Sequence, residues 1–229
     1  MANTPLPGAV QPAAAGLSGF DVNSILSATG AQNLKNAGYD FCVRYVPRTA
    51  ALAAGNLTNA EALNILNAGL ALMAVQHVAI EGWVPDENLG AAYGSYAATY
   101  ASEVVGLPRG MNIWCDLEGV APGTDAADVI AYCQAWYDAV NAAGYVPGIY
   151  VGWDTMLTSQ QLYSDLPFQH YWRAYNGPGV ATRGFQVLQT TEKTVSGITI
   201  DPDTTQNDNL GGTALWLSTQ PILAAGGTS

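Results

Sequence analysis

The stretch NIWCDLEGV, Asn112 to Val120, places two acidic residues at the end of an apolar run. Only 11% of the 229 residues are charged and 49% are apolar, so a carboxylate inside an apolar segment is conspicuous here. Burying one is costly. Because side chains alternate across a strand, Trp114, Asp116 and Glu118 share one face and the apolar residues between them share the other. The stretch therefore predicts a strand with two acids directed to one side.

Outward from this strand, apolar runs alternate with segments of helical pattern, several of which end at glycine. The expected strands are 17–23, 40–46, 70–78, 111–118 and 146–153. The expected helices are 27–37, 58–68, 89–105, 125–143 and a short one at 159–165. This alternating order predicts a parallel sheet.

The rhythm changes after residue 165. Three further strands are expected at 170–176, 184–190 and 197–201, and the segments between them are too short for a packed crossover helix. Eight strands with late helices missing favour an α/β fold of the TIM-like (β/α)8 type with incomplete outer helices over an open doubly wound sheet. The glycine-rich fingerprints of nucleotide-binding folds are absent from the sequence.

The simplest organisation is one barrel domain at 17–222, between a flexible leader at 1–16 and a flexible tail at 223–229, and we expect a monomer. The three cysteines, Cys42, Cys115 and Cys133, have no CxxC spacing. They are interpreted as reduced core residues, with one bridge left open.

The net charge of −11 makes nucleic acid and anionic membrane surfaces poor partners, because both repel an acidic chain. No run of 18 apolar residues exists, so membrane insertion is not expected. The first residues have neither the basic start nor the apolar core of a signal peptide. As given, the chain is cytosolic, processed or exported by another route.

A barrel would bring four acids to one mouth, because barrel enzymes place their chemistry at the carboxyl ends of the strands. Asp21 shares the inward face of the first strand, and Asp116 and Glu118 end the fourth. Asp201 is expected to end the eighth strand, beside the first. The alternative is structural: Asp116 and Glu118 would cap a loop, and Asp201 would begin an Asp-Pro turn.

Clustered carboxylates raise one another's pKa, so one can stay protonated while another is ionised. Glycoside hydrolysis requires this arrangement. Magnesium or calcium binding is the competing chemistry. Zinc is less favoured, because His77 and His170 are the only histidines and neither lies in an H-E-x-x-H pattern. We expect neither a metal nor another cofactor.

Aromatic residues on strands, or just after them, favour a sugar ligand, because flat rings suit the apolar faces of sugars. Several of these rings must serve the core instead. The residues assigned to substrate binding are Tyr45, Gln76, Tyr150, Trp153, Trp172, Gln189 and Asp203.

The motifs GFDVN, DLE, GYVPGIYVGW, YWRAY, VLQTT and ITID, in this order, resemble glycoside hydrolase family 25, the lysozyme-type muramidases. Through GFDVN, FCVRYV and IDPDTTQ the chain is most similar to the glycoside hydrolase-like proteins classed as domain of unknown function 1906. The resemblance covers Leu17 to Gly212, nearly the whole chain.

The resemblance implies a barrel with incomplete helices that cleaves peptidoglycan between N-acetylmuramic acid and N-acetylglucosamine. By motif, Glu118 matches the general acid, Asp116 its partner in D-x-E, and Asp21 the acid of the first strand. Asp201 matches the acid of the last strand, although Asp203 is also available. The family's Tyr-His after the third strand is replaced by VQHVAIEGW.

The leading hypothesis is thus a glycoside hydrolase acting on peptidoglycan or a related β-linked glycan, located outside the cell or in its envelope. Glu118 would protonate the leaving oxygen, and the other acids would stabilise charge or position the attacking group. An enzymic nucleophile, direct attack by water and assistance by the sugar's acetamido group all remain open. The alternative is a glycan-binding module that kept the fold and lost turnover.

Overall fold

The computed structural model describes residues 3–221 and contains a closed barrel of eight strands. Neighbours pair in sequence, and β4 pairs with β5 to complete the ring. This confirms the barrel expected from the sequence. The barrel strands are β2 (Ser18–Val22), β3 (Phe41–Val46), β4 (Ala71–Gln76), β5 (Asn112–Leu117), β6 (Val146–Val151), β7 (His170–Arg173), β8 (Val187–Gln189) and β10 (Ile198–Thr205).

The eighth barrel strand, β10, runs antiparallel to both of its neighbours, β2 and β8, whereas the other seven are parallel. The parallel order predicted from the alternating segments therefore does not extend to this strand. The physical reason is the connection: β9 (Lys193–Val195) and β10 form a hairpin, so the chain turns back without a crossover helix. Asp201 consequently lies within β10 and does not end it, contrary to expectation.

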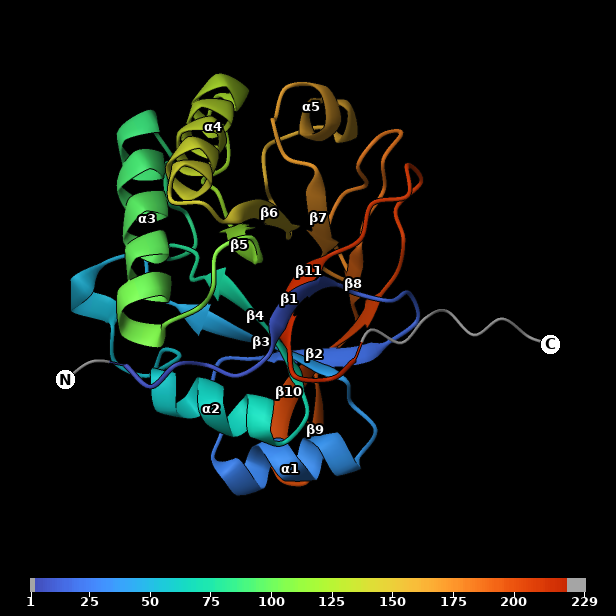
Figure 1. Ribbon diagram of the computed structural model, residues 1–229. Helices are drawn as coiled ribbons and strands as arrows, with labels where there is room; N and C mark the ends of the chain where they lie inside the picture. The colour runs from blue at the N-terminus through green and yellow to red at the C-terminus, as the bar shows by residue number, and fades with distance from the viewer. Residues whose placement is uncertain (1–2, 222–229) are drawn as a thin grey trace.

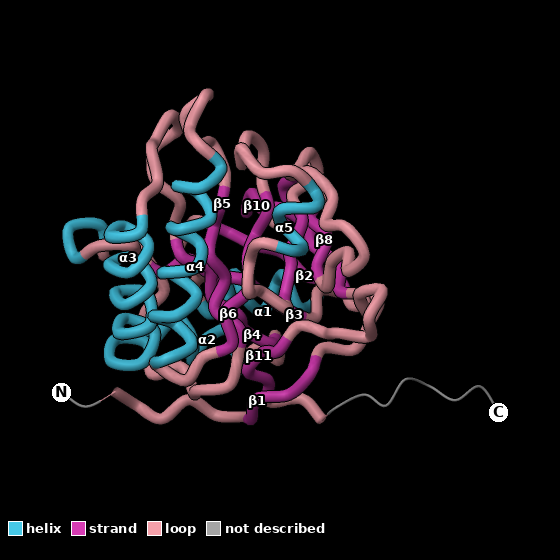
Figure 2. The backbone as a smooth tube through the Cα atoms, turned by 90° about the horizontal axis from the view of Figure 1, so that it is seen from above, coloured by secondary structure: helices cyan, strands magenta, loops and turns pink. Residues whose placement is uncertain are grey.

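The helices follow the predicted segments closely and start at side-chain caps, as helix N-termini prefer. Ser27, Thr58, Asp86, Asp125 and Thr158 each accept a hydrogen bond from a first-turn amide. Loops occupy the side next to β8 (Figure 2). The helices are α1 (Ala28–Asn36), α2 (Asn59–Asn67), α3 (Glu87–Thr99), α4 (Ala126–Ala142) and α5 (Ser159–Ser164), with a 3-10 turn at Ala50–Leu52 and a π-helical turn at Tyr100–Val105.

Helices α3 and α4 lie side by side against the barrel (Figure 1). Two glycines of α3 allow this close approach. A Cβ added to Gly90 would lie 2.2 Å from the carbonyl oxygen of Tyr132, and one added to Gly94 would lie 2.7 Å from that of Trp136. The helix backbones are therefore in contact at these two points.

The apolar residues form two layers separated by the barrel wall. The outer layer lies between barrel and helices and includes Ile113, Cys115 and Leu117 of β5. The inner layer fills the barrel and includes Trp114 and Trp172. This confirms the alternation predicted for the opening stretch. All three cysteines are buried and unbridged.

Strand β1 (Ala9–Pro12) lies within the stretch expected to be a flexible leader, and pairs antiparallel with β11 (Leu215–Ser218). Strand β11 in turn pairs with β4. For residues 9–12 the leader expectation is therefore corrected. The domain limits 17–222 and the monomer stay predictions, and the expected tail, 223–229, lies outside the described residues. Within 3–221, no helix is long and apolar enough to cross a membrane.

Candidate active site

The barrel brings together four acids from segments that are far apart in the sequence. They come from β2, from the end of β5 and from β10. Asp21 lies on β2, directly opposite Asp201 of β10. Asp116 lies on β5, and Glu118 follows one residue after this strand. Asp21 is influenced by the charges of Asp201 and Glu118, and Asp116 by those of Glu118 and Asp21. The four predicted acids thus form one cluster at the mouth.

Asp21 is buried, and both of its carboxylate oxygens accept hydrogen bonds. The hydroxyl of Tyr45 donates to Oδ1 at 3.0 Å, and the Nε2 amide of Gln189 donates to Oδ2 at 2.7 Å. Burial raises the pKa of Asp21 to about 7, while the hydrogen bond from Gln189 acts in the opposite direction. Asp21 can therefore change its charge near neutral pH.

Glu118 lies against Gly152, which follows β6. A Cβ added to Gly152 would lie 2.3 Å from Oε2 of Glu118, so only glycine leaves room for this carboxyl group. The indole of Trp83 donates to the backbone carbonyl of Glu118 at 2.9 Å. Burial, followed by the charge of Asp201, raises the pKa of Glu118 to about 7. Within residues 3–221 its carboxyl oxygens accept no hydrogen bond.

Asp116 is more deeply placed than Glu118. Its Oδ1 is buried without a hydrogen-bond partner among the described residues. Burial and then the charge of Glu118 raise its pKa well above the usual range. A buried carboxyl group next to other acids is favoured in its protonated form. Asp116 can therefore hold a proton beside Glu118.

Asp201 and Asp203 are two residues apart on β10, so both point to the face that Asp21 occupies, but they lie at different depths in the barrel. Asp201 is half-buried, and burial raises its pKa. Asp203 is buried opposite Gly19, further from the mouth, and accepts a hydrogen bond from the indole of Trp172 at 2.8 Å. Of the two candidates for the last acid, Asp201 is thus the one at the mouth.

The aromatic residues assigned to substrate binding divide between rim and core. Tyr45 and Tyr150 line the barrel beside the acids, and Trp153 is half-exposed at the rim. Trp172 is 1% exposed and packs edge-on against Tyr150 with ring centroids 4.6 Å apart. Trp172 and Asp203 therefore support the site from beneath and are not available to a ligand, which corrects their assignment.

Gln76, also assigned to substrate binding, faces out of the barrel. It is fully buried, and its Oε1 accepts a hydrogen bond from the indole of Trp136 on α4. Its amide donates to the carbonyl of His77 at 2.8 Å. The alternation of β4 explains this, because Val75 faces inward and its neighbour must face the helices. Gln76 joins α4 to the barrel and has no place in the site.

Sequence reasoning missed Gly152. A glycine next to a strand frequently marks a close approach, and this one lies within the VPGIYVGW segment, so a signal was present. It gave no indication of which group approaches, because the neighbour, Glu118, comes from another strand.

The described residues hold no group of three or more His, Cys, Asp or Glu side chains arranged to bind a metal ion. The absence of a metal requirement stays a prediction. His77 stacks on Tyr45 with ring centroids 4.3 Å apart, and burial lowers its pKa to about 4. His77 is thus neutral at physiological pH.

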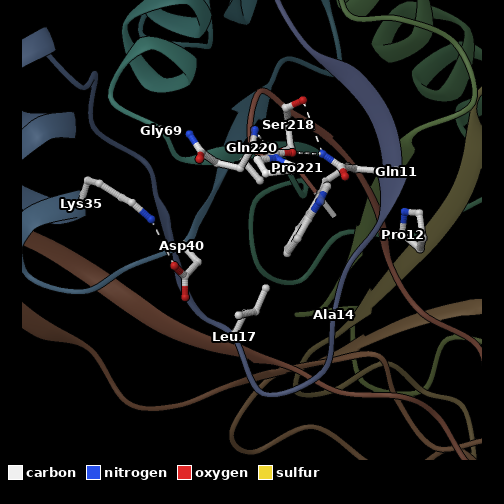
Figure 3. Close-up of a pocket in the computed structure, with 12 residues that line it drawn as sticks. Gln11, Pro12, Ala14, Leu17, Lys35, Asp40, Gly69, Ser218, Gln220 and Pro221 are labelled. Carbon is white, nitrogen blue, oxygen red and sulfur yellow. Dashed lines mark hydrogen bonds and ion pairs between the residues drawn. The ribbon is translucent and has the colours of Figure 1, made fainter. Parts of the chain in front are cut away.

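Hollows occur at both ends of the barrel. At the mouth, one is lined by residues that include Tyr175 and Gln189, and another by residues that include Trp153 and Asn176. A further pocket of ≈160 Å³ lies away from the acids, between β1, β11 and the start of β2, with the ion pair of Lys35 and Asp40 on its rim (Figure 3). None of the four clustered acids lines this pocket.

Residues 32–205 match the model of the Rv2525c-like, glycoside hydrolase-like domain. The chain belongs to this family. The match covers Asp116, Glu118 and Asp201, and it agrees with the resemblance seen in the sequence motifs. No curated protein matches the chain.

Solved structures share the fold at low sequence identity. The Tat-secreted protein Rv2525c of Mycobacterium tuberculosis has a TM-score of 0.62 at 14% identity, over 84% of this chain and 95% of that one. A family 25 glycosyl hydrolase from Bacillus anthracis has a TM-score of 0.56 at 14% identity, over 83% and 89%. The spore cortex lytic enzyme SleM of Clostridium perfringens has a TM-score of 0.62 at 13% identity, over 83% and 67%.

Proposed function

We propose that this protein is a glycoside hydrolase that cleaves peptidoglycan or a related β-linked glycan. The observation that carries the proposal is the pair Glu118 and Asp21, two acids at one barrel mouth whose pKa values are both raised to about 7. Two carboxyl groups that titrate near neutral pH can exist with one protonated and one ionised, as glycoside hydrolysis needs. The family membership and the lytic enzymes of the same fold support the choice of substrate.

Glu118 is the general acid in this proposal, because its carboxyl group is free of hydrogen bonds within residues 3–221 and can reach a ligand. It donates its proton to the glycosidic oxygen as the bond to the anomeric carbon breaks. Asp21 is the carboxylate, since both of its oxygens are held by donors that favour the ionised form. Its negative charge stabilises the oxocarbenium-like transition state.

The remaining groups support these two. Asp201, opposite Asp21, adds negative charge that raises the pKa of Glu118 and so keeps its proton in place. Asp116, which is favoured in its protonated form, holds a proton next to Glu118. Trp153, half-exposed at the rim, presents a ring on which a pyranose can lie, whereas Tyr150 is buried and Tyr45 is stacked on His77. The partner is thus a polysaccharide, and we place the protein outside the cell or in its envelope, as the Tat-secreted and cortex-lytic relatives support.

Incubation with purified peptidoglycan tests the proposal, with soluble products identified by mass spectrometry. Cleavage should release muropeptides with a new reducing end, and the sugar at this end identifies the bond broken. Insoluble chitin and cellulose serve as comparison substrates for other β-linked glycans. Sedimentation of the protein with each polymer measures binding separately. Binding without any new reducing end would overturn the hydrolase and favour a glycan-binding module.

A further inference from the structure

Asp21 lies within a chain of hydrogen bonds that joins residues of four barrel strands. The hydroxyl of Tyr150, on β6, donates to Oε1 of Gln189, on β8, at 2.9 Å. The Nε2 amide of Gln189 donates to Oδ2 of Asp21, on β2, at 2.7 Å. From the other side, the hydroxyl of Tyr45, on β3, donates to Oδ1 at 3.0 Å. Both oxygens of Asp21 and both ends of the Gln189 amide are therefore occupied.

The direction of these bonds fixes the amide. If the Gln189 side chain were turned over, its carbonyl oxygen would face the Asp21 carboxylate, and two acceptors would meet without a proton between them. The Tyr150 hydroxyl secures the productive orientation by donating to the carbonyl oxygen. Each end of the amide makes one hydrogen bond and keeps a second hydrogen-bonding position, so the substrate-binding role expected from the sequence stays a prediction beside this structural role.

We propose that Gln189 is a positioning residue, oriented by Tyr150, that holds Asp21 as an ionised carboxylate aimed at the barrel mouth. This inference rests on the proposed function for its chemical meaning, since it states which acid carries the negative charge. It also separates the roles of the acids: Asp21 has two fixed donors, whereas Glu118 has none among the described residues. The donor to the substrate and the acceptor of positive charge are thus distinguished by their hydrogen bonds.

The surroundings of Asp21 make such a device necessary. The groups that face it are otherwise neutral hydroxyls or acids, and burial by itself favours the neutral carboxyl group. Only donors such as Tyr45 and Gln189 act against this. The titratable groups around Asp21 are Tyr45 of β3, with His77 stacked on it, Asp116 and Glu118 at the end of β5, Tyr150 of β6, and Asp201 and Asp203 of β10.

Two variants test the inference without depending on turnover. Gln189→Leu keeps much of the side-chain volume and removes the amide, and Tyr150→Phe removes only the hydroxyl that orients it. The titration of Asp21 is followed by carbon-detected NMR of the carboxyl groups, with Asp21→Asn used to assign the resonance. Gln206→Leu is the matched control, because Gln206 donates to the carbonyl of Phe185 at 2.9 Å in another part of the barrel.

In Gln189→Leu the pKa of Asp21 should rise by about one unit, because the ionised form loses a donor. Tyr150→Phe should shift it in the same direction by less, and Gln206→Leu should not shift it. In glycan cleavage the apparent pKa of the acidic limb of the pH–rate profile should rise by the same amount. At pH values below this pKa kcat should be reduced, while KM should stay nearly unchanged. These outcomes support the inference.

An unchanged titration of Asp21 in folded Gln189→Leu would overturn the inference, and so would a rise in KM alone, which indicates contact with substrate. If Gln189→Leu does not fold, the titration of Tyr150→Phe decides. If the native protein shows no cleavage of any glycan but Gln189→Leu shifts the Asp21 titration, the proposed function fails and the positioning of Asp21 stands. The two failures are therefore distinguishable.

Discussion

Glu118 and Asp21 have similar pKa values but opposite hydrogen-bond surroundings. Burial raises the pKa of each to about 7. Asp21 accepts two hydrogen bonds, and Glu118 lies over a glycine with its carboxyl oxygens unbonded within residues 3–221. At the scale of single residues, the proposed roles of Glu118 as proton donor and Asp21 as charge stabiliser therefore follow from the hydrogen bonds around each carboxyl group and not from the residue type.

Replacing Glu118 with Gln keeps the shape of the side chain and removes its transferable proton. Cleavage of peptidoglycan should fall by about 10²-fold or more, while binding to the insoluble polymer persists. Glu103→Gln is the control, because Glu103 is exposed on the π-helical turn that follows α3 and is not one of the clustered acids. Undiminished turnover in Glu118→Gln would exclude this residue as the acid.

Replacing Gly152 with Ala should displace Glu118, because the new Cβ would lie 2.3 Å from its Oε2. We expect kcat to fall by about 10- to 100-fold through misplacement of the acid. Gly179→Ala is the matched control: an added Cβ there lies 3.6 Å from its nearest neighbour, the Ser159 hydroxyl, which is an ordinary contact. Equal kcat values in Gly152→Ala and Gly179→Ala would show that a methyl group at position 152 does not displace Glu118.

At the scale of elements, the helices were predictable because their N-cap residues can be recognised in the sequence. Thr58 and Asp125 precede helices whose starts the structure places one residue later. The strand β10 was only partly predictable. Its continuation through Pro202 to Thr205 was not expected, and its reversed direction follows from the hairpin that it forms with β9. A local pattern gives the type of an element, but its direction in a sheet is set by its neighbours.

The contact between α3 and α4 supplies a prediction about stability. Gly90→Ala improves intrinsic helix propensity by about 1 kcal/mol, but its Cβ would lie 2.2 Å from the backbone oxygen of Tyr132. Overpacking against a backbone atom outweighs propensity, so the free energy of unfolding should fall by about 1–3 kcal/mol. Chemical denaturation measures this, with the exposed Ser95→Ala on the same helix expected within about 0.5 kcal/mol of native. A stabilised Gly90→Ala would show that the helices can separate freely.

At the scale of the whole molecule, the acid cluster links stability to pH. Asp21 and Glu118 have pKa values raised from 3.8 and 4.5 to about 7, so the folded state binds more protons than the unfolded state in this range. Their contribution is complete below the usual values and is lost as the pH rises through about 7. His77 and His170, with pKa values lowered from 6.5 to about 4, act in the opposite sense below 6.5.

The Tm should therefore be lower at about pH 8.5 than at about pH 6.5. Over this interval the loss of stability from the acids exceeds the gain from the two histidines, whose effect lies mainly below pH 6.5. Asp21→Asn, which stays neutral at every pH, should show a smaller drop over this interval. Calorimetry across the range measures both. A Tm that rises from pH 6.5 to 8.5 in the native protein would contradict the raised pKa values of the cluster.

The cluster is expected to work without a metal ion. Addition of a chelator should change neither the Tm nor glycan cleavage across acidic to neutral pH. If a cation were held by these acids, its removal would lower one or both, and calcium or magnesium would restore them. Such a loss and recovery would replace the hydrolytic interpretation of the cluster with a metal site.

The sequence by itself determined the barrel, the alternation of the strand NIWCDLEGV and the convergence of Asp21, Asp116 and Glu118 on one end. These follow from local rules: side chains alternate along a strand, and parallel strands end at a common edge. Asp201 reaches the same end by another route, because it pairs with Asp21 from within the antiparallel strand β10. The inward faces of Asp21 and Asp116 needed no information from distant residues. The order of the motifs then identified the family, which the match over 32–205 confirms.

Only the tertiary structure decided what each side chain meets. Gln76 falls on the helix side because its neighbour on β4, Val75, faces into the barrel, and Trp172 is covered because its ring fills the barrel. The contacts of Gln189 with Asp21 and of Gly152 with Glu118 join residues from different strands. No local pattern encodes such pairs, because closure of the barrel sets their distances.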